Sequence, residues 1–233
     1  DDRCVVYVTW EQTVEEYGMV DLAKLSGHSV DDFAKALVSD WERVKRAAVQ
    51  MATVPVWTIG HSGKTRGKLP PMTLQMVTEN LLWMEKTGSI KPSLVILDYL
   101  QIFRSSSKRQ ERRLEIDDNV QDAKNLAFDL GCPVMMGSQA KQDLMNREYK
   151  LPDSYASKES SSTAYASDRI LSVWRPFMTE KPGATVPVRG KRIKVTPKLF
   201  LIGVQKQKFG PDGAVFPYWL DPGKSILTPW GEM

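Results

Sequence analysis

Cysteine and histidine are scarce in this chain of 233 residues, which contains two of each. Both cysteines, Cys4 and Cys132, lie in apolar runs typical of strands, so we expect reduced thiols in a protein core rather than a disulfide or a metal site. The two histidines, His28 and His61, are too isolated to form a metal centre. No spacing of Ser, His and Asp indicates a nucleophilic triad, which leaves little support for a hydrolase of that class.

Long hydrophobic runs are also missing. No window approaches the ~18–20 uninterrupted apolar residues of a membrane span, and no signal peptide is visible. With 42% hydrophobic and 26% charged residues, the composition is typical of a soluble globular protein, and we expect a cytoplasmic location and no membrane partner. The chain begins at Asp1 and its strand-like residues begin almost at once, so we expect that further N-terminal sequence precedes it.

Acidic residues are absent from one long stretch and scarce in another. Residues 181–208 contain many lysines and arginines and no acid, and residues 104–113 contain Glu111 as their one acid. The net charge of the chain is only +4. Two basic clusters on a nearly neutral chain indicate local contacts with anions such as phosphates, although basic loops are also often only solvated surface.

Strand and helix patterns alternate along the first 140 residues. Beyond them strands dominate, with an irregular or hairpin segment at 176–196. This order predicts an α/β fold in which a mostly parallel central sheet is flanked by helices and extended by antiparallel strands on its C-terminal side, in one domain over residues 1–233. The predicted strands are 4–9, 55–59, 93–97, 132–136, 170–174, 199–204 and 214–220, the helices 13–25, 31–51, 72–88 and 114–130, and the loops 60–71, 104–113 and 146–163.

The predicted strand at 93–97 ends abruptly on Asp98. An aspartate at the carboxyl end of a parallel strand stands where open α/β sheets bind their ligands. Burying a carboxylate there is costly unless a cation or hydrogen bonds compensate it, and Mg²⁺ beside nucleotide phosphates is a common compensation. The alternative is an aspartate that caps the next turn.

Three predicted strands are followed by polar side chains, namely Glu11, Asp98 and Gln139. The carboxyl ends of parallel strands lie at the same edge of a sheet, so these side chains could converge on one site. A glutamate can accept a proton from an attacking water, an aspartate can hold Mg²⁺, and a glutamine can orient a phosphate or a water. Each residue alone is a weak indication, because strand ends carry polar residues routinely.

The segment at residues 60–65 contains Gly-Lys-Thr after a strand but does not fit a phosphate-binding P-loop. A P-loop needs four residues between its two glycines, and only two separate Gly60 from Gly63. It must also run directly into a helix, whereas a segment with two prolines follows here. We therefore expect a plain loop.

Five segments, in the same order, resemble the C-terminal RecA-like ATPase domain of DnaB-type replicative helicases. Residues 97–101 (LDYLQ) are similar to the family's Walker-B segment. Residues 133–139 (PVMMGSQ) are similar to its strand that ends in serine-glutamine. The other three are Val8-Thr9-Trp10-Glu11-Gln12, the stretch of Glu159-Ser160-Ser161-Ser162 with residues 168–175, and Lys206-Gln207-Lys208-Phe209-Gly210-Pro211. The resemblance covers nearly the whole chain.

The resemblance implies an ATP-dependent DNA helicase motor with ATP and Mg²⁺ as its cofactors. In that mechanism Asp98 holds Mg²⁺ through water, Glu11 polarises the attacking water, and Gln139 reports loss of the γ-phosphate. Lys206 and Lys208 would enter the nucleotide site of the adjacent subunit as a trans-acting finger.

The resemblance also implies a homo-oligomeric ring, a hexamer, that grips the backbone of single-stranded DNA and works with replication or loader proteins. Contacts to that backbone would be independent of sequence and sensitive to salt. The residues implied are Arg104, Lys108, Arg109, Arg112, Arg113, Lys141 and Arg147.

The sequence departs from the family's pattern in three places. The P-loop is absent, Lys208 replaces the arginine of the finger and lacks its bidentate fork, and residues 60–71 and 180–198 match nothing in the family. Two alternatives therefore stay open: a RecA-like ATPase for recombination, mobile-element replication or defence that does not unwind DNA, and a pseudo-ATPase that serves as a nucleic-acid-binding or scaffold module.

Overall fold

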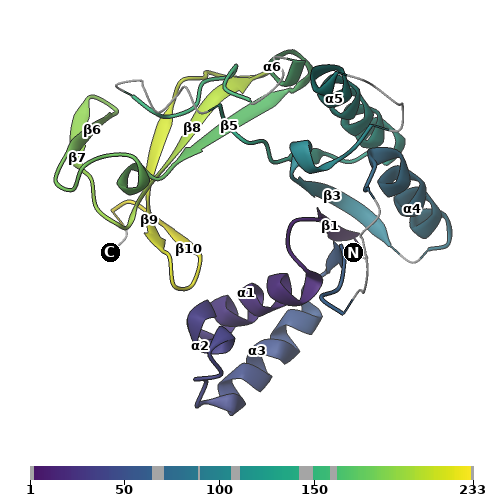
Figure 1. The fold of residues 1–233 in the computed structure, drawn as a ribbon, viewed down its shortest axis with the longest axis horizontal. Coiled ribbons are helices and arrows are strands. Elements are labelled where there is room, and N and C mark those ends of the chain that lie inside the picture. The colour runs from purple at the N-terminus through teal and green to yellow at the C-terminus, as the bar shows by residue number, and fades with distance from the viewer. Residues whose placement is uncertain are drawn as a thin grey trace. The chain divides into compact units, whose positions relative to one another are not determined.

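The computed structural model describes residues 3–64, 71–88, 90–105, 111–141, 149–157 and 162–231. Contacts within the chain divide it into two compact units, Asp1–Gln139 and Ala140–Met233, and each is described by itself (Figure 1). The expectation of one domain over residues 1–233 stays a prediction.

The first unit is built on a parallel sheet of four strands in the order β2-β1-β3-β4. The register pairs Thr9 with Asp98 and Leu97 with Met136, so the carboxyl ends of β1, β3 and β4 lie along one edge. The four strands confirm the prediction from apolar, β-branched runs. They are β1 (Arg3–Thr9), β2 (Val56–Ile59), β3 (Lys91–Asp98) and β4 (Val134–Met136).

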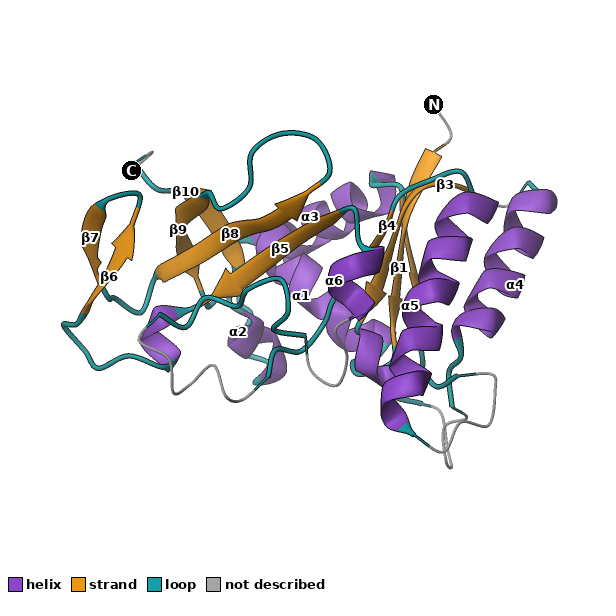
Figure 2. Cartoon of the chain, turned by 90° about the horizontal axis from the view of Figure 1, so that it is seen from above, coloured by secondary structure: helices purple, strands orange, loops and turns teal. Residues whose placement is uncertain are grey.

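Two helices cover one face of this sheet, α4 (Leu74–Lys86) and α5 (Arg112–Asp129), as Figure 2 shows. Side chains alternate across a strand, so every second residue of β1 and β3 points into the core beneath these helices. Burial of each large aliphatic side chain there contributes ~1.5–3 kcal/mol. The core includes Val6, Val8, Val95, Leu97, Leu81 and Leu126, together with the two free cysteines, Cys4 and Cys132.

The predicted C-terminal ends of these two helices, before Gly88 and Gly131, are confirmed. The Thr73 hydroxyl accepts a hydrogen bond from the Met76 N–H and caps the start of α4. Gly88 and Gly131 follow the helices in the left-handed region, with φ of 72° and 59°, where glycine is preferred. A short 3-10 helix, η1 (Leu100–Ile102), follows β3.

The prediction of a single helix over residues 31–51 is wrong. The structure has α2 (Val30–Ala34) and α3 (Trp41–Thr53), after α1 (Val14–Ser26). Ala36 takes a positive φ of 54°, and the Asp40 side chain accepts from the Arg43 N–H as a new N-cap. Leu37 and Trp41, which the pattern placed on an apolar face, are 65% and 57% exposed. A second capping signal therefore prevailed over apolar spacing.

The second unit holds an antiparallel sheet of four strands in the order β10-β9-β8-β5, and a separate β6–β7 hairpin. The hairpin and the predicted strands are confirmed, whereas the short helix α6 overlaps a stretch predicted as loop. The elements are α6 (Ser162–Ala166), β5 (Arg169–Trp174), η3 (Pro176–Met178), β6 (Thr185–Val188), β7 (Lys191–Lys194), β8 (Leu199–Gln207), β9 (Val215–Asp221) and β10 (Ile226–Pro229). Its core gathers Leu151, Trp174, Val186, Val188, Val195, Leu199 and Leu201.

Within the described ranges, none of the helices combines the length and the apolar character needed to cross a bilayer.

Candidate functional site

Asp98 is the last residue of β3, and its carboxylate is bound by a tyrosine of the neighbouring strand. The Tyr7 hydroxyl donates a hydrogen bond to Oδ2 of Asp98. The Tyr7 ring stacks on Tyr17 with 4.3 Å between ring centroids. Burial, and next the hydrogen bond to Asp98, raise the pKa of Tyr7 well above its usual range. Tyr7 therefore stays protonated at neutral pH and is a permanent donor to Asp98.

Thr9 lies directly beside Asp98 in the register of β1 and β3 and is completely buried. Its hydroxyl opposes part of the rise in the pKa of Tyr7, yet it forms no hydrogen bond of adequate geometry with any described residue. A buried hydroxyl without a partner costs free energy.

Glycines follow the two outer strands where they approach β1 and β3. A Cβ atom at Gly60 would lie 2.8 Å from the carbonyl oxygen of Thr9, and one at Gly137 would lie 3.5 Å from Oδ1 of Asp98. The Gly137 N–H also donates to the carbonyl of Leu97, at 3.0 Å. The absence of a side chain at Gly60 therefore lets the backbone close tightly around the strand ends.

The side-chain amide of Gln101 joins the loop after β3 to the turn after β4. Its Nε2 donates to the Ser138 hydroxyl at 3.1 Å, and its Oε1 accepts from the Gln139 N–H at 3.2 Å. The backbone turn that carries Gln139 is thereby tied to the segment that carries Asp98, while the side chain of Gln139 is exposed.

Glu11 lies in an exposed bend just after β1. The preceding Trp10 is partly buried against the core and contacts the His61 ring edge-on, at 5.5 Å between centroids. The topology thus brings Glu11, Asp98 and Gln139 to the same edge of the sheet, as predicted. Their catalytic roles stay predictions.

Tyr7, Thr9 and Gln101 were not predicted as site residues. Gln101 stood in the motif around Asp98 without a role. The alternation in β1 could have placed Tyr7 and Thr9 on one face, but their contact with Asp98 depends on which strand lies beside β1 and in which register.

Residues 60–64, part of the Gly-Lys-Thr segment that does not fit a P-loop, bind the carboxylate of Glu15. The Ser62 hydroxyl donates to Oε1 of Glu15, and the Gly63 N–H donates to Oε2 at 3.0 Å. These two bonds, the Ser62 bond first, lower the pKa of Glu15 to about 2. Donors that would face a phosphate in a true P-loop are therefore engaged by Glu15.

The donor set near Asp98 fits a magnesium ion that a nucleotide brings with it. Among the described residues there is no group of three or more histidine, cysteine or acidic side chains that could enclose a metal. Mg²⁺ commonly binds through one or two carboxylates, waters and substrate phosphates rather than an all-protein cage. Asp98, held at Oδ2 by Tyr7, suits that mode.

In the first predicted DNA-binding cluster, Arg104 and Arg112 both contact Glu115. Arg112 forms an ion pair with Glu115 and also donates to the backbone carbonyls of Gln101 and Phe103, the latter at 3.5 Å. Burial raises the pKa of Glu115, but the Arg112 bond, the Ser105 N–H and the nearby arginines outweigh it and lower the pKa overall. These contacts make Arg112 an internal anchor. Arg113 is exposed, and Lys108 and Arg109 lie outside the described residues.

The predicted cations of the second unit are partly engaged with its own backbone. Lys141 donates to the Tyr155 carbonyl at 3.0 Å, and Arg147 lies outside the described residues. Lys206 donates to the carbonyl of Ala164 in α6, at 2.7 Å. Lys208 lies 3.6 Å from Asp168 and is mostly exposed. The finger role of Lys206 and Lys208 stays a prediction.

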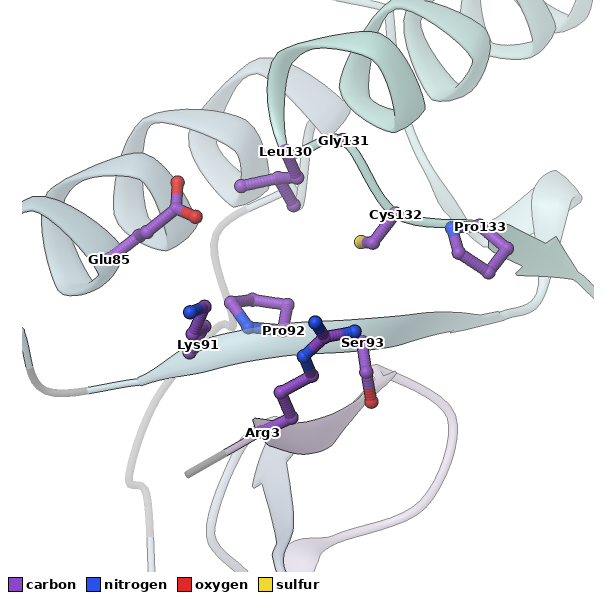
Figure 3. Close-up of a pocket in the computed structure, with 9 residues that line it drawn as sticks. All are labelled: Arg3, Glu85, Lys91, Pro92, Ser93, Leu130, Gly131, Cys132 and Pro133. Atoms are coloured by element: carbon purple, nitrogen blue, oxygen red, sulfur yellow. The ribbon is translucent and has the colours of Figure 1, made fainter. Parts of the chain in front are cut away.

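A cavity of about 230 Å³ lies at the opposite, amino-terminal edge of the parallel sheet (Figure 3). Burial, and next the carboxylate of Glu85, raise the pKa of the Cys132 thiol. A protonated thiol is a poor nucleophile, so this cavity adds no chemistry to the strand ends. It is lined by Arg3, Glu85, Lys91, Pro92, Ser93, Leu130, Gly131, Cys132 and Pro133.

Comparison with known proteins agrees with this geometry. The family model of the DnaB-like helicase C terminal domain matches residues 1–222. The replicative DNA helicase DnaB of Pasteurella multocida (strain Pm70) is 29% identical over 184 residues, which cover 75% of this chain and 36% of that protein. The DnaB of Rickettsia felis is 30% identical over 156 residues, 64% of this chain and 31% of that protein. The chain thus spans about a third of these relatives' length.

Two solved structures share the fold. One, described as an ATPase domain, superposes with a TM-score of 0.80 at 15% identity, over 98% of this chain and 75% of that one. A DnaB-like replicative helicase, described with its interactions with primase, superposes with a TM-score of 0.79 at 14% identity, over 97% of this chain and 50% of that one. The RecA-like α/β fold predicted from the sequence is confirmed, and the chain belongs to the family of DnaB-like helicase C-terminal domains.

Proposed function

We propose that this chain is the ATP-hydrolysing motor of a replicative DNA helicase, which couples ATP hydrolysis to movement along single-stranded DNA. One observation carries the proposal. At the carboxyl edge of the parallel sheet, Asp98 lies beside Tyr7 and the unpartnered Thr9 hydroxyl, in a chain of the DnaB-like family. That edge is where α/β sheets bind nucleotides.

Asp98 acts as the Walker-B carboxylate and holds Mg²⁺ through a water. When bound, Mg²⁺ neutralises charge on the phosphates of ATP. Tyr7 fixes one oxygen of Asp98 and leaves Oδ1 for the ion's water. Glu11, on the bend after β1, polarises the water that attacks the γ-phosphate.

Gln139 reports the loss of the γ-phosphate to the DNA-binding loops. The turn that carries Gln139 is hydrogen-bonded to Gln101 in the segment that follows Asp98. A movement of Asp98 would therefore be passed to Gln139 through the side chain of Gln101, which supports this role. Lys206 and Lys208 neutralise charge at the nucleotide of the adjacent subunit, and the exposed Lys208 suits this task better than the engaged Lys206.

Single-stranded DNA runs past the basic loop at residues 104–113 and the loop at 146–163. Arg104, Lys108, Arg109, Arg113, Lys141 and Arg147 contact its phosphates, while Arg112 holds the base of the first loop in place. The working form is a hexameric ring. The interactions with primase described for a structural neighbour support a replication protein as a further partner.

The test is ATP hydrolysis stimulated by single-stranded DNA, measured on the full-length natural protein and its Asp98→Asn variant. We expect turnover to fall at least about 100-fold, because the neutral amide no longer holds the metal charge. Asp31→Asn is the matched control, since Asp31 is an exposed acid whose side chain forms an ion pair with Lys35. Unchanged turnover in Asp98→Asn would remove the Walker-B assignment.

A further inference from the structure

The β6–β7 hairpin lies within residues 180–198, outside the five segments that carry the resemblance to DnaB-type helicases. Its strands, Thr185–Val188 and Lys191–Lys194, are joined by Arg189 and Gly190 (Figure 1). Both turn residues have positive φ, 49° and 74°. This is the two-residue turn whose twist matches that of antiparallel strands. The hairpin is thus a well-formed local structure.

One face of the hairpin is fixed to the core of the second unit. Val186, Val188 and the following Val195 are 4%, 4% and 3% exposed, and they belong to the same buried cluster as Leu199 and Leu201. The Val195 N–H also donates to the Ala184 carbonyl at 2.8 Å. The hairpin therefore presents its other residues from a fixed platform rather than from a free arm.

Four cations lie among the remaining residues of the hairpin, and all four are exposed. Lys191, Arg192 and Lys194 are exposed on β7. Arg192 is oriented by Thr185, whose hydroxyl accepts from Nε at 2.7 Å and whose carbonyl accepts from Nη2 at 3.1 Å. Arginine has five donors, so three stay available for a ligand. The guanidinium of Arg189 lies 4.1 Å from the centroid of the Phe216 ring.

No described carboxylate lies within ion-pair distance of these hairpin cations, and residues 181–208 contain no acid. In contrast, two other lysines of the same unit are paired, Lys150 with Glu180 and Lys208 with Asp168. Arg192 and Lys194, two positions apart on β7, share one face of the strand, so without counter-charge they repel each other. An anion with several charges would relieve that repulsion.

We propose that the β6–β7 hairpin is a second nucleic-acid contact, which binds the sugar–phosphate backbone of a single strand. A single strand fits best because Phe216, 37% exposed beside Arg189, offers an aromatic surface next to the cations. That combination is typical of sites that bind single strands without regard to sequence. The inference rests on the proposed function in one respect, namely that the chain works on nucleic acid.

The test is binding of a fluorescent oligothymidylate to the full-length protein across a range of salt concentrations, with Lys191→Gln, Arg192→Gln and Lys194→Gln combined. We expect the affinity to fall at least ~10-fold and the slope of log affinity against log salt to flatten by about 2, at ~0.7 for each lost contact with a single strand. The matched control removes the same charge from helices α3 and α4 by Lys45→Gln, Arg46→Gln and Lys86→Gln, and should keep the original slope.

Further measurements distinguish a direct contact of the hairpin with DNA from a purely structural role. Arg192→Lys keeps the charge but loses the bonds to Thr185, so it should retain the salt slope; a loss as large as in the triple variant would make the hairpin's role structural and overturn the proposal. A triple variant that binds like its control overturns it as well, even if Asp98→Asn behaves as a motor variant should. If the unmodified protein binds no single strand, the proposed function fails together with this inference.

Discussion

The Tyr7 hydroxyl donates a hydrogen bond to the carboxylate of Asp98 across the neighbouring strands β1 and β3. Tyr7 is 91 positions away from Asp98 in the sequence. Because burial and this bond raise its pKa, the tyrosine does not lose its proton at any pH at which such a protein works. The hydrogen bond thus occupies Oδ2 of Asp98. In the proposed mechanism, Oδ1 binds the water of the magnesium ion.

Tyr7→Phe should lower stability by about 1.5–3 kcal/mol, the range for a hydrogen bond to a charged group, and should weaken Mg²⁺-dependent nucleotide binding. The raised pKa means that the folded state holds the Tyr7 proton more tightly than the unfolded state does. Its contribution is therefore full below the unfolded value near 10 and is lost as the pH rises above it. Denaturant unfolding from pH 8 to 11 should show a steeper loss in the unmodified protein than in Tyr7→Phe. Tyr218→Phe, on β9, is the control, and equal curves for Tyr7→Phe and the unmodified protein would contradict the assignment.

Gln101→Ala should uncouple DNA from nucleotide turnover. The change frees the Ser138–Gln139 turn, so we expect stimulation by single-stranded DNA to fall while basal ATP hydrolysis persists. The loss of two hydrogen bonds should cost ~1–2 kcal/mol. Gln75→Ala removes an amide that donates to Glu79 within the same helix and should preserve the stimulation. Retained stimulation in Gln101→Ala would show that the two hydrogen bonds of Gln101 are not needed to couple DNA binding to ATP hydrolysis.

The Glu15 carboxyl should titrate near pH 2, as carbon-detected NMR of labelled glutamate can show. A folded pKa below the unfolded one stabilises the fold above the unfolded value of about 4.5, and this contribution is lost as the pH falls from there towards 2. Ser62→Ala removes the largest cause and should move the titration upward. Ser39→Ala, on an exposed loop, should leave it unchanged. A Glu15 pKa in the ordinary range would mean that the Gly60–Lys64 turn does not hold this carboxylate.

Replacement of the adjacent residues Arg112 and Arg113 should affect different properties, namely stability for Arg112 and DNA binding for Arg113. Arg112→Ala removes the ion pair with Glu115 and two bonds to backbone carbonyls, so we expect a stability loss of about 2 kcal/mol or more. Arg113→Ala, on an exposed side chain, should change stability by less than about 0.5 kcal/mol and should instead flatten the salt dependence of DNA binding by roughly 0.7. Thermal unfolding and oligonucleotide titration of both variants give the comparison. The reverse pattern would contradict both roles.

The sequence predicted the parallel strands because β-branched runs such as Leu94–Leu97 leave few other conformations, and it predicted helix ends where Gly88 and Gly131 stand. It failed between residues 34 and 41, where apolar spacing and the capping signal of Asp40 competed and the local cap prevailed. The sequence predicted only some of the residues of the candidate site. Strand-end positions indicated Asp98, whereas the contacts of Tyr7, Thr9 and Gln101 depend on strand order and register, which one sequence does not reveal.

Cys4 on β1 and Cys132, two residues before β4, belong to the same buried core, and both thiols are free. With exposures of 4% and 8% and pKa values raised chiefly by burial, both thiols are protected from alkylating reagents while the sheet is intact. The rate at which such a reagent modifies these thiols therefore measures how often the first unit opens. Any nucleotide that binds at the strand ends should slow this modification.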